Sequence, residues 1–298
     1  MVLPANFRTL LDDLRHHDSV LWRRAVAAGV TVGPDAFVRY SPVLFGLLFA
    51  VTLPRHREAV RRNLRLALGP RSAAEEQRDI ARVFVNFAAS LTEAFIAGSE
   101  RGNRLTGVCV NDEHYAAAAA RGAGVIFVTA HTGGWHAAGP LLQSVYAADV
   151  MVVMQRERDA RAEAVQDGAR DRVGVRVLRV GDDPLAVLPL LSHLRHRGVV
   201  AVQIDRLPEG LRGREVELFG VPWRVPEGPL QLAAVSGAPI LPVFTRRRGF
   251  MDYEVLIAPP IAIPRRPSAA ELDKAARQIA AEMERFVREH PTQWFHFA

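Results

Sequence analysis

Two histidines, His131 and His136, are the residues best placed in this chain to move protons near neutral pH. The apolar residues 125–128 before them predict a buried strand, and the Gly133-Gly134 pair leads into an alanine-rich run that predicts a helix. His131 therefore lies just past the carboxyl end of a predicted strand, where open α/β sheets bind their ligands. We expect residues 122–142 to hold the chemical centre.

Several common kinds of site are absent from the sequence. Ser236 lies in V-S-G-A and no G-x-S-x-G elbow occurs, which argues against an α/β-hydrolase. No Walker loop or dinucleotide fingerprint is present. Cys109 is the single cysteine, and the two histidines are five residues apart, off the i, i+4 face of zinc proteases, so we predict no metal centre. A nucleic-acid partner is not expected, because only the net charge of +6 favours it.

A histidine at a strand end without a neighbouring nucleophile suits a general base. Such a base deprotonates a substrate hydroxyl, which then attacks an activated acyl group. A carboxylate that fixes the tautomer of the imidazole and stabilises its protonated form would help most, as in a catalytic triad without the serine.

Alternating strand and helix patterns surround this stretch and predict an α/β fold. We expect one domain over residues 1–298, with a mostly parallel central sheet and helices on both faces. Ser72–Glu75 and Ser268–Glu271 are capping boxes that predict the starts of two long helices. The predicted strands cover residues 125–128, 150–154, 175–180, 199–204, 214–219, 239–245 and 253–257. The aromatic tail from Pro291 is expected to pack back on the body.

Residues 1–70 predict a helical region that associates with a membrane. The apolar run 42–54 is short of the ~20 residues that span a bilayer. It leads into a helix on which Arg57, Arg61 and Arg65 form one basic stripe, a pattern typical of binding to an anionic membrane surface. A core helix followed by a solvated charged face is the alternative. Residues 1–40 predict irregular or short helical structure, and residues 1–27 show no signal peptide.

The segment H-T-G-G-W-H at 131–136 resembles the H-x4-D/E signature of the bacterial lipid A late acyltransferases, a superfamily shared with phosphatidylinositol mannoside acyltransferases. Five further segments support the resemblance, which covers residue 40 to the end: R-R-N-L-R-L-A-L-G-P (61–70), Asp205-Arg206, E-V-E-L-F-G-V-P (215–222), the run 226–244 and P-T-Q-W-F (291–295). It implies transfer of a fatty acyl chain from an acyl carrier protein or coenzyme A thioester to a hydroxyl of a lipid A precursor or related glycolipid. No further cofactor is implied. The expected location is peripheral, on the cytoplasmic face of the bacterial inner membrane.

The resemblance also implies roles for individual residues. His131 is the general base, and Glu215 or Glu217, on one face of a predicted strand, is expected to supply the carboxylate that orients it. Asp205 matches part of a recurring family pair and is expected at the catalytic site. The remaining residues implied in substrate binding are Arg206, Glu157 and Arg172.

His136 stands where the family carries Asp or Glu, and a neutral imidazole lacks the fixed charge of a carboxylate. Glu215 can serve His131 instead, the catalytic layout can differ, or the chain can have lost activity. A merely structural His131 is a further possibility. At the level of the whole protein, the alternatives to an acyltransferase are a lipid-binding protein on the membrane surface and a thioester hydrolase.

Overall fold

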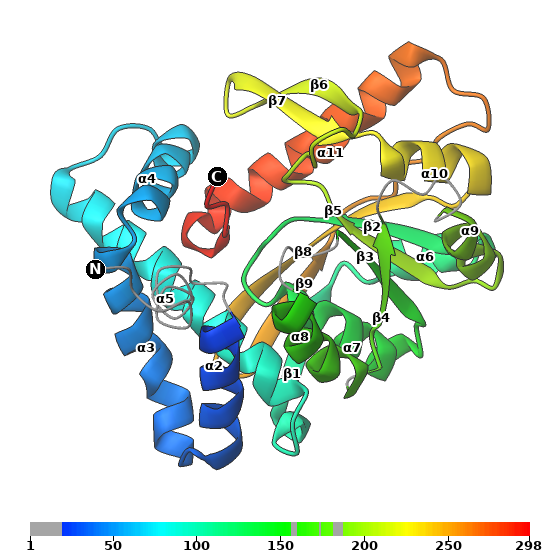
Figure 1. Ribbon diagram of the computed structural model, residues 1–298. Coiled ribbons are helices and arrows are strands. Elements are labelled where there is room, and N and C mark those ends of the chain that lie inside the picture. Colours follow the sequence, from blue (N-terminus) through cyan, green and yellow to red (C-terminus); the bar gives the residue numbers. More distant parts are fainter. Residues whose placement is uncertain (1–19, 156–159, 173, 181–186) are drawn as a thin grey trace, which may run out of the picture.

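The computed structural model describes residues 20–155, 160–172, 174–180 and 187–298, and its centre is a seven-stranded sheet (Figure 1). The strand order is β1-β9-β8-β2-β5-β3-β4, with β2 in the middle. The five strands from β8 to β4 are parallel, whereas β9 is antiparallel to β8 and carries β1 parallel to itself at the edge. The strands are β1 (Thr106–Val110), β2 (Val125–Thr129), β3 (Val150–Gln155), β4 (Arg176–Val180), β5 (Val199–Gln203), β8 (Ile240–Gly249) and β9 (Asp252–Ile257). The predicted mostly parallel sheet is confirmed.

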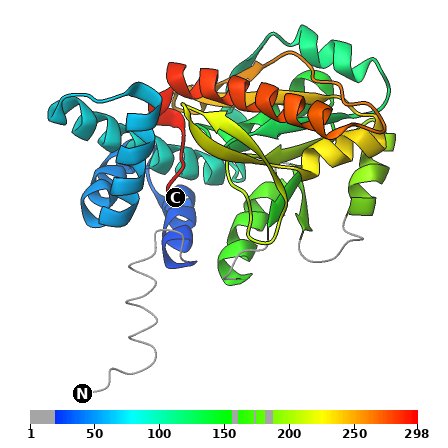
Figure 2. The same ribbon diagram turned by 90° about the horizontal axis from the view of Figure 1, so that it is seen from above.

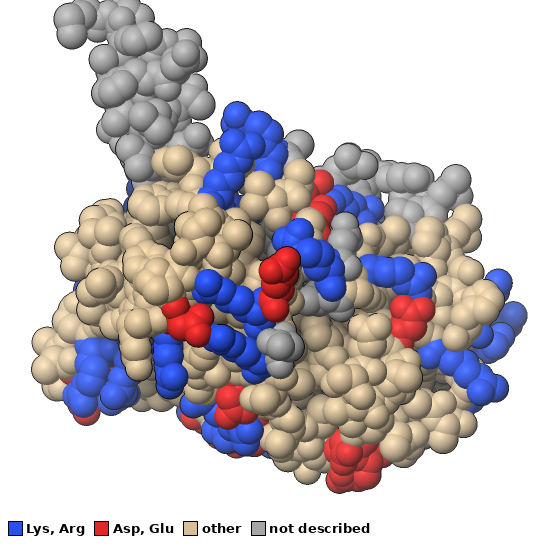
Figure 3. All heavy atoms as spheres, turned by 90° about the horizontal axis from the view of Figure 1, so that it is seen from below, with Lys and Arg blue, Asp and Glu red and all other residues tan. Residues whose placement is uncertain are grey.

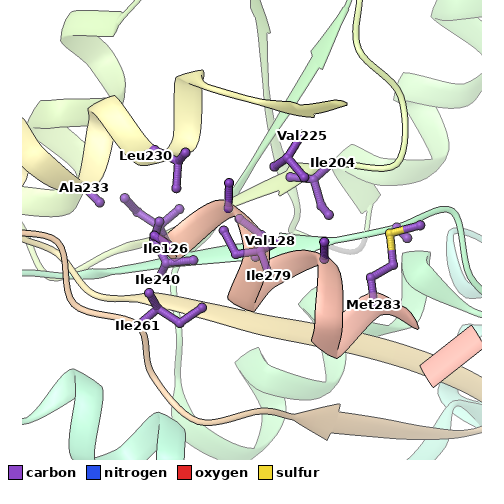
Figure 4. Close-up of a cluster of buried hydrophobic side chains, with 14 of the residues drawn as sticks. Ile126, Val128, Ile204, Val225, Leu230, Ala233, Ile240, Ile261, Ile279 and Met283 are labelled. Carbon is purple, nitrogen blue, oxygen red and sulfur yellow. The ribbon is translucent and has the colours of Figure 1, made fainter. Parts of the chain in front are cut away.

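Helices cover both faces of the sheet because its central strands are apolar on both sides. In β2, Ile126 and Val128 face one core and Val125 and Phe127 face the other. The first core lies under α9 (Val187–Arg195), α10 (Gly228–Ser236) and α11 (Ala269–Glu289), and Figure 4 shows part of it. The second lies under α6 (Glu113–Ala119) and α7 (Trp135–Tyr146). Side chains of β2 are thus fixed from both sides, which holds the end of that strand firmly.

The antiparallel hairpin of β6 (Gly213–Leu218) and β7 (Val221–Pro226) forms a separate two-stranded sheet beside α11. Val216 and Leu218 point into the first core, and the side chains that alternate with them, Glu215 and Glu217, are exposed. The predicted half-exposed strand is confirmed. Strands β7 and β1 were not predicted, since neither carries a long apolar run.

The amino-terminal part of the described chain consists of four helices: α2 (Val20–Val32), α3 (Asp35–Thr52), α4 (Pro54–Leu68) and α5 (Ala73–Ala97). Helix α5 begins at the capping box predicted at Ser72, and α11 at the one predicted at Ser268. Helices α2 and α3 start within residues 1–40, where only irregular or short helical structure was expected. Helix α8 (Ala160–Arg172) packs against α2 and α5.

Helix α3 packs on α5 through a narrow stripe of Val38, Pro42, Gly46 and Ala50 at intervals of four residues. A Cβ at position 46 would lie 2.6 Å from the Val85 Cα, so glycine is what lets the two helices approach closely. Most of the other large apolar side chains of α3 are exposed, apart from Phe49, which packs on Trp22 of α2. The exposed ones are Phe37, Tyr40, Val43, Leu44, Phe45, Leu47, Leu48 and Val51.

Helices α3 and α5 are both long and apolar enough to cross a membrane by length and composition alone. Helix α5 has 56% of its apolar window buried and carries the buried acids Asp79 and Glu93, so it is a core helix of the fold. Only 22% of the α3 window is buried. The predicted apolar run is therefore part of an 18-residue helix, longer than the run itself.

The C-terminal strap, residues 291–298, returns from α11 and lies between the α4–α5 pair and the hairpin (Figures 1 and 2). Its backbone bonds the loop after β2: the Phe295 N–H donates to the His131 carbonyl at 2.7 Å, and the Gly133 N–H donates to the Gln293 carbonyl at 2.8 Å. Phe297 packs on Phe84 and Phe87 of α5. The predicted packing of the tail on the body is confirmed.

Candidate active site

His131 and Asp205 meet at the carboxyl edge of the sheet because they extend neighbouring parallel strands. Thr129 of β2 is in register with Gln203 of β5, and each polar residue follows two positions later. The His131 Nδ1 atom lies 2.8 Å from the Asp205 Oδ1 atom. The His131 backbone N–H also donates to Oδ2 of the same carboxylate at 3.1 Å. Both the ring and the main chain of His131 are thus bound to one acid.

Asp205 is fully buried and ionised. Burial alone would raise the pKa of this carboxyl group, but His131, His296 and Arg206 together hold that pKa well below its usual range. The indole N–H of Trp294 donates to Oδ2 at 3.1 Å, so two oxygens accept three hydrogen bonds. A buried carboxylate with this many donors stays charged and keeps its orientation.

The arrangement gives His131 a defined tautomer. An ionised carboxylate only accepts hydrogen bonds, so Nδ1 must carry the proton that it donates to Asp205. The lone pair of the neutral ring is then on Nε2, and the side chain is 26% exposed at the edge of the sheet. This is the histidine–carboxylate half of a triad, able to take a proton from a bound hydroxyl group.

His296 lies behind the dyad, stacked on Trp294 with ring centroids 5.1 Å apart and planes 14° from parallel. Its Nδ1 atom is 4.0 Å from the Asp205 Oδ2 atom, too far for a hydrogen bond. Burial lowers the pKa of His296 to about 4, although Asp205 opposes this, so the ring is neutral at neutral pH. At neutral pH the second imidazole therefore contributes packing behind Asp205. It lowers the pKa of Asp205 only in acid, where the His296 ring is protonated.

The prediction that Glu215 or Glu217 orients His131 is not what the structure shows. Both carboxylates lie on the exposed face of the β6–β7 hairpin, because Val216 and Leu218 take the inward positions of the strand. Asp205 occupies Nδ1 of His131 instead. Asp205 was predicted as a site residue, but its role as the partner of His131 was not.

The other predicted binding residues fall in different places. Arg206 follows Asp205, is exposed, and donates to the Phe295 carbonyl of the strap at 3.1 Å. Arg172, in α8, donates from Nε to the carbonyl of Gly98 just after α5, which ties it to the helical region. Glu157 lies outside the described residues. Trp294 was missed as a site residue, although the P-T-Q-W-F segment that holds it was noted.

His136 is in the first turn of α7 and contacts Tyr253 rather than the Nδ1 side of His131. Its Nε2 atom is 3.4 Å from the Tyr253 hydroxyl, with the two ring planes at 83°. Within the described parts of the chain, no group of three His, Cys, Asp or Glu side chains is placed to hold a metal ion.

The chain is similar in sequence to known proteins. The family model described as bacterial lipid A biosynthesis acyltransferase matches residues 13–298. A phosphatidylinositol mannoside acyltransferase of Mycobacterium tuberculosis is 28% identical over 246 residues, which cover 80% of this chain and 74% of that protein. The protein of the same name from a second strain is 27% identical over 187 residues, covering 61% of this chain and 56% of its own length.

Proposed function

Because this chain belongs to the bacterial lipid A biosynthesis acyltransferase family and is an acyltransferase, we propose that His131 is the general base that activates a glycolipid hydroxyl. The observation that carries the proposal is the bond of 2.8 Å between His131 Nδ1 and the buried Asp205. It leaves Nε2 as the basic atom of a partly exposed ring at the sheet edge. The acyl donor we propose is a thioester of acyl carrier protein or of coenzyme A.

The reaction proceeds in two stages. His131 Nε2 takes the proton of the acceptor hydroxyl while its oxygen attacks the carbonyl carbon of the thioester. The tetrahedral intermediate then collapses with cleavage of the carbon–sulfur bond, and the imidazolium returns its proton to the leaving thiolate. Asp205 stabilises the imidazolium in between. General-base contributions of this kind amount to roughly 10²–10⁴ in rate.

For the acceptor we propose a lipid A precursor or a related glycophospholipid. Family membership supports the first, and the two mycobacterial relatives, named for a phosphatidylinositol mannoside, support the second. Arg206 is exposed beside the dyad and, within the described part of the chain, forms no ion pair with a carboxylate. Its remaining guanidinium N–H groups suit a phosphate of the substrate, which arginine binds through two parallel hydrogen bonds.

We propose that α3 places the enzyme on the membrane that contains the acceptor. Leu44 and Val51 are each 71% exposed, and a contiguous apolar surface of this extent is typical of a membrane or partner contact. In Figure 3 the side of the molecule formed by α2 and α3 is mostly uncharged, whereas charges of both signs lie toward the middle. Since α3 is attached to α5 along one stripe, it suits immersion in the interface better than spanning the bilayer.

Basic residues next to α3 favour an anionic lipid surface. Helix α4 begins at Pro54, directly after α3, and Arg55 and Arg62 are exposed on it. The predicted basic stripe is only partly available, because Arg61 and Arg65 form ion pairs with Glu76 of α5. Thioester donors are water-soluble products of the cytoplasm, so we place the enzyme peripherally on the cytoplasmic face of the inner membrane.

The test incubates purified protein with labelled acyl carrier protein or acyl-coenzyme A thioesters and a bacterial lipid extract. Wild type should transfer label into a lipid, and His131→Ala should lose this activity while its thermal unfolding is unchanged. The matched control is Glu215→Gln, an exposed carboxylate on the hairpin, which should retain full activity. Equal labelling by wild type and His131→Ala would refute the proposal.

The same assay separates the two alternatives. Release of free fatty acid without a labelled lipid would indicate a thioester hydrolase, in which His131 activates water. Lipid binding with no turnover of any thioester would indicate a protein that has lost catalysis.

A further inference from the structure

Strand β8 extends beyond its neighbour β2, and side chains bind the part of its edge that β2 does not reach. The ladder with β2 ends at Pro242, whereas β8 runs on to Gly249. Buried N–H and C=O groups on such an edge need other partners. Thr245, which is 1% exposed, donates its N–H to the Thr132 hydroxyl at 3.3 Å. Two residues further along, the N–H and C=O groups at this edge belong to Arg247.

Gln293 of the C-terminal strap binds both backbone groups of Arg247 with one side chain. Its Oε1 atom accepts the Arg247 N–H at 2.7 Å, and its Nε2 atom donates to the Arg247 carbonyl at 3.0 Å. A residue of a neighbouring antiparallel strand would exchange the same two bonds. A primary amide offers an acceptor and a donor side by side, whereas a carboxylate only accepts. The amide of Gln293 therefore takes the place of a strand.

Arg247 is a firm attachment point because its side chain is bound in the core. Its guanidinium pairs with the Oε1 atom of Glu93 on α5 at 2.7 and 2.9 Å, and Glu93 is 1% exposed. The other carboxylate oxygen of Glu93 accepts a hydrogen bond from the Tyr253 hydroxyl. A buried ion pair with a further donor holds its groups in one arrangement. The amide of Gln293 is thus attached to a part of the sheet that α5 keeps in place.

The same glutamine also contacts the loop that carries His131. The Gln293 carbonyl accepts the Gly133 N–H at 2.8 Å. A Cβ on Gly133 would lie 2.1 Å from the Gln293 Oε1 atom, so the backbone of the loop packs directly on the amide. Position 133 requires glycine for this reason, since any side chain would displace the amide from β8. One residue thus joins the edge of β8 to the loop.

The two bonds of the amide also oppose a slip of the strap along the loop. Strap and loop pair through a single antiparallel bridge between Thr132 and Trp294, and so short a pairing specifies its register weakly. A slip by one residue would turn the Trp294 side chain to the opposite face and take its indole N–H away from Asp205. The same slip would carry the Gln293 amide away from Arg247. Those two bonds therefore favour the observed register.

We propose that Gln293 is a positioning residue whose side-chain amide takes the place of a strand on β8 and fixes the register in which the strap holds the His131 loop. The next two strap residues then reach their partners: Trp294 donates to Asp205, and Phe295 donates to the His131 carbonyl. The effect on acyl transfer rests on the function proposed above. The fixing of the register does not.

The first test follows hydrogen exchange of the full chain by mass spectrometry and needs no substrate. Gln293→Met keeps the size of the side chain but offers Arg247 neither an N–H donor nor an oxygen acceptor. We expect peptides from residues 130–135 and 291–298 to exchange about tenfold faster or more, because two hydrogen bonds are lost. Peptides from β2 and α11 should exchange at the wild-type rate, because those elements keep their own bonds.

Asn86→Ala is the matched control, because Asn86 also binds the strap but does so from α5. Its amide donates to the Thr292 carbonyl at 3.0 Å, one residue before Gln293. Both backbone groups of Arg247 keep their partner in this variant, so peptides from residues 130–135 should exchange at the wild-type rate. Equal acceleration in Asn86→Ala and Gln293→Met would show that any tether of the strap suffices, and the inference would be wrong.

The second test asks whether Gln293 acts through the contact of the strap with Asp205. In the transfer assay, Gln293→Met should lower kcat about tenfold to a hundredfold with KM unchanged, because the base is displaced from the reacting hydroxyl. Trp294→Phe should have little further effect in the Gln293→Met background, since the register that places the indole is already lost. A merely structural glutamine would leave the cost of Trp294→Phe the same in both backgrounds.

The two tests fail in distinguishable ways. Wild-type exchange of residues 130–135 in Gln293→Met would overturn the inference even if acyl transfer is confirmed. A wild-type protein without acyl transfer would refute the proposed function, and the exchange rates would still decide the role of Gln293. If Gln293→Met does not fold, Gln293→Asn replaces it, since an amide that is one methylene shorter falls short of Arg247 and should give the same acceleration.

Discussion

Two regions of this molecule depart from the usual distribution of residues in opposite ways. At the carboxyl edge of the sheet, a charged Asp205 is fully buried, and three donors compensate for its burial. On α3, eight large apolar side chains are exposed. Buried charges and extended exposed apolar surfaces are the informative exceptions to ordinary packing. Under the proposed function, the first region orients a proton acceptor and the second contacts lipid. Substitutions in the two regions should therefore affect acyl transfer and membrane attachment separately.

Replacement of Asp205 gives the largest expected effect. Asp205→Asn keeps the shape but offers an amide that cannot stabilise an imidazolium, and it can hold His131 in the wrong tautomer. We expect kcat to fall by about 10²–10⁴. Single-turnover transfer of a labelled acyl chain measures this. Binding of the protein to anionic vesicles should be unchanged, because α3 is untouched. A fall of less than threefold would show that Asp205 does not assist His131.

The buried neutral His296 predicts a loss of stability in acid. Its pKa is 6.5 in the unfolded chain and about 4 in the fold, so between these values the unfolded state binds more protons. The contribution of neutral His296 to the free energy of unfolding is complete above pH 6.5. It is lost as the pH falls from 6.5 to 4, which lowers that free energy by about 3 kcal/mol. Urea unfolding at pH 7 and pH 4.5 measures it. His296→Phe should flatten this dependence, and an unaltered slope in that variant would assign the effect to other groups.

For the apolar surface of α3, the most informative variant is the double substitution Leu44→Ser and Val51→Ser. Both side chains are largely exposed, so the fold should keep its stability within about 0.5 kcal/mol. Each side chain that inserts into lipid contributes on the order of 1 kcal/mol or more. We therefore expect a loss of vesicle affinity of about tenfold to a hundredfold in sedimentation assays. Acyl transfer to a detergent-dispersed acceptor should be retained. Unchanged vesicle binding would exclude α3 as the attachment surface.

Much of the fold could be predicted because its signals are local. The apolar run of β2, the capping boxes at Ser72 and Ser268, and the alternation that leaves Glu215 outside are all visible in short windows of sequence. The partner of His131 could not be chosen this way. It depends on β5 pairing with β2, which brings Asp205 beside His131 across 74 residues, and no local pattern encodes strand order.

The role of Trp294 could not be predicted for a similar reason. Its contact with Asp205 exists only because the C-terminal strap runs back past the end of β2 and pairs with Thr132. An aromatic tail predicts packing, but not which polar group its indole will reach. Glu93 and Tyr253 are separated by 160 residues and meet only through the packing of α5 on the edge of the sheet.

The smallest effect expected within the site comes from Trp294→Phe, which tests whether the strap orients the dyad. The change keeps an aromatic ring against His296 and removes one hydrogen bond to a buried carboxylate. His131 still binds both oxygens of Asp205 in this variant. A charge-assisted hydrogen bond is worth about 1.5–3 kcal/mol, and only part of this acts on the transition state. We therefore expect kcat to fall about tenfold.

Trp223→Phe is the matched control, because Trp223 packs on the same rings and its indole nitrogen is buried with no hydrogen-bond partner among the described residues. That control should keep its kcat, because no donor to Asp205 is lost. If both variants lose activity equally, the strap contributes aromatic packing alone. If only Trp294→Phe loses activity, the indole N–H of Trp294 helps to fix Asp205. The orientation of His131 then depends on a segment 163 residues away in the chain, which the hydrogen bond from Phe295 to the His131 carbonyl holds in place.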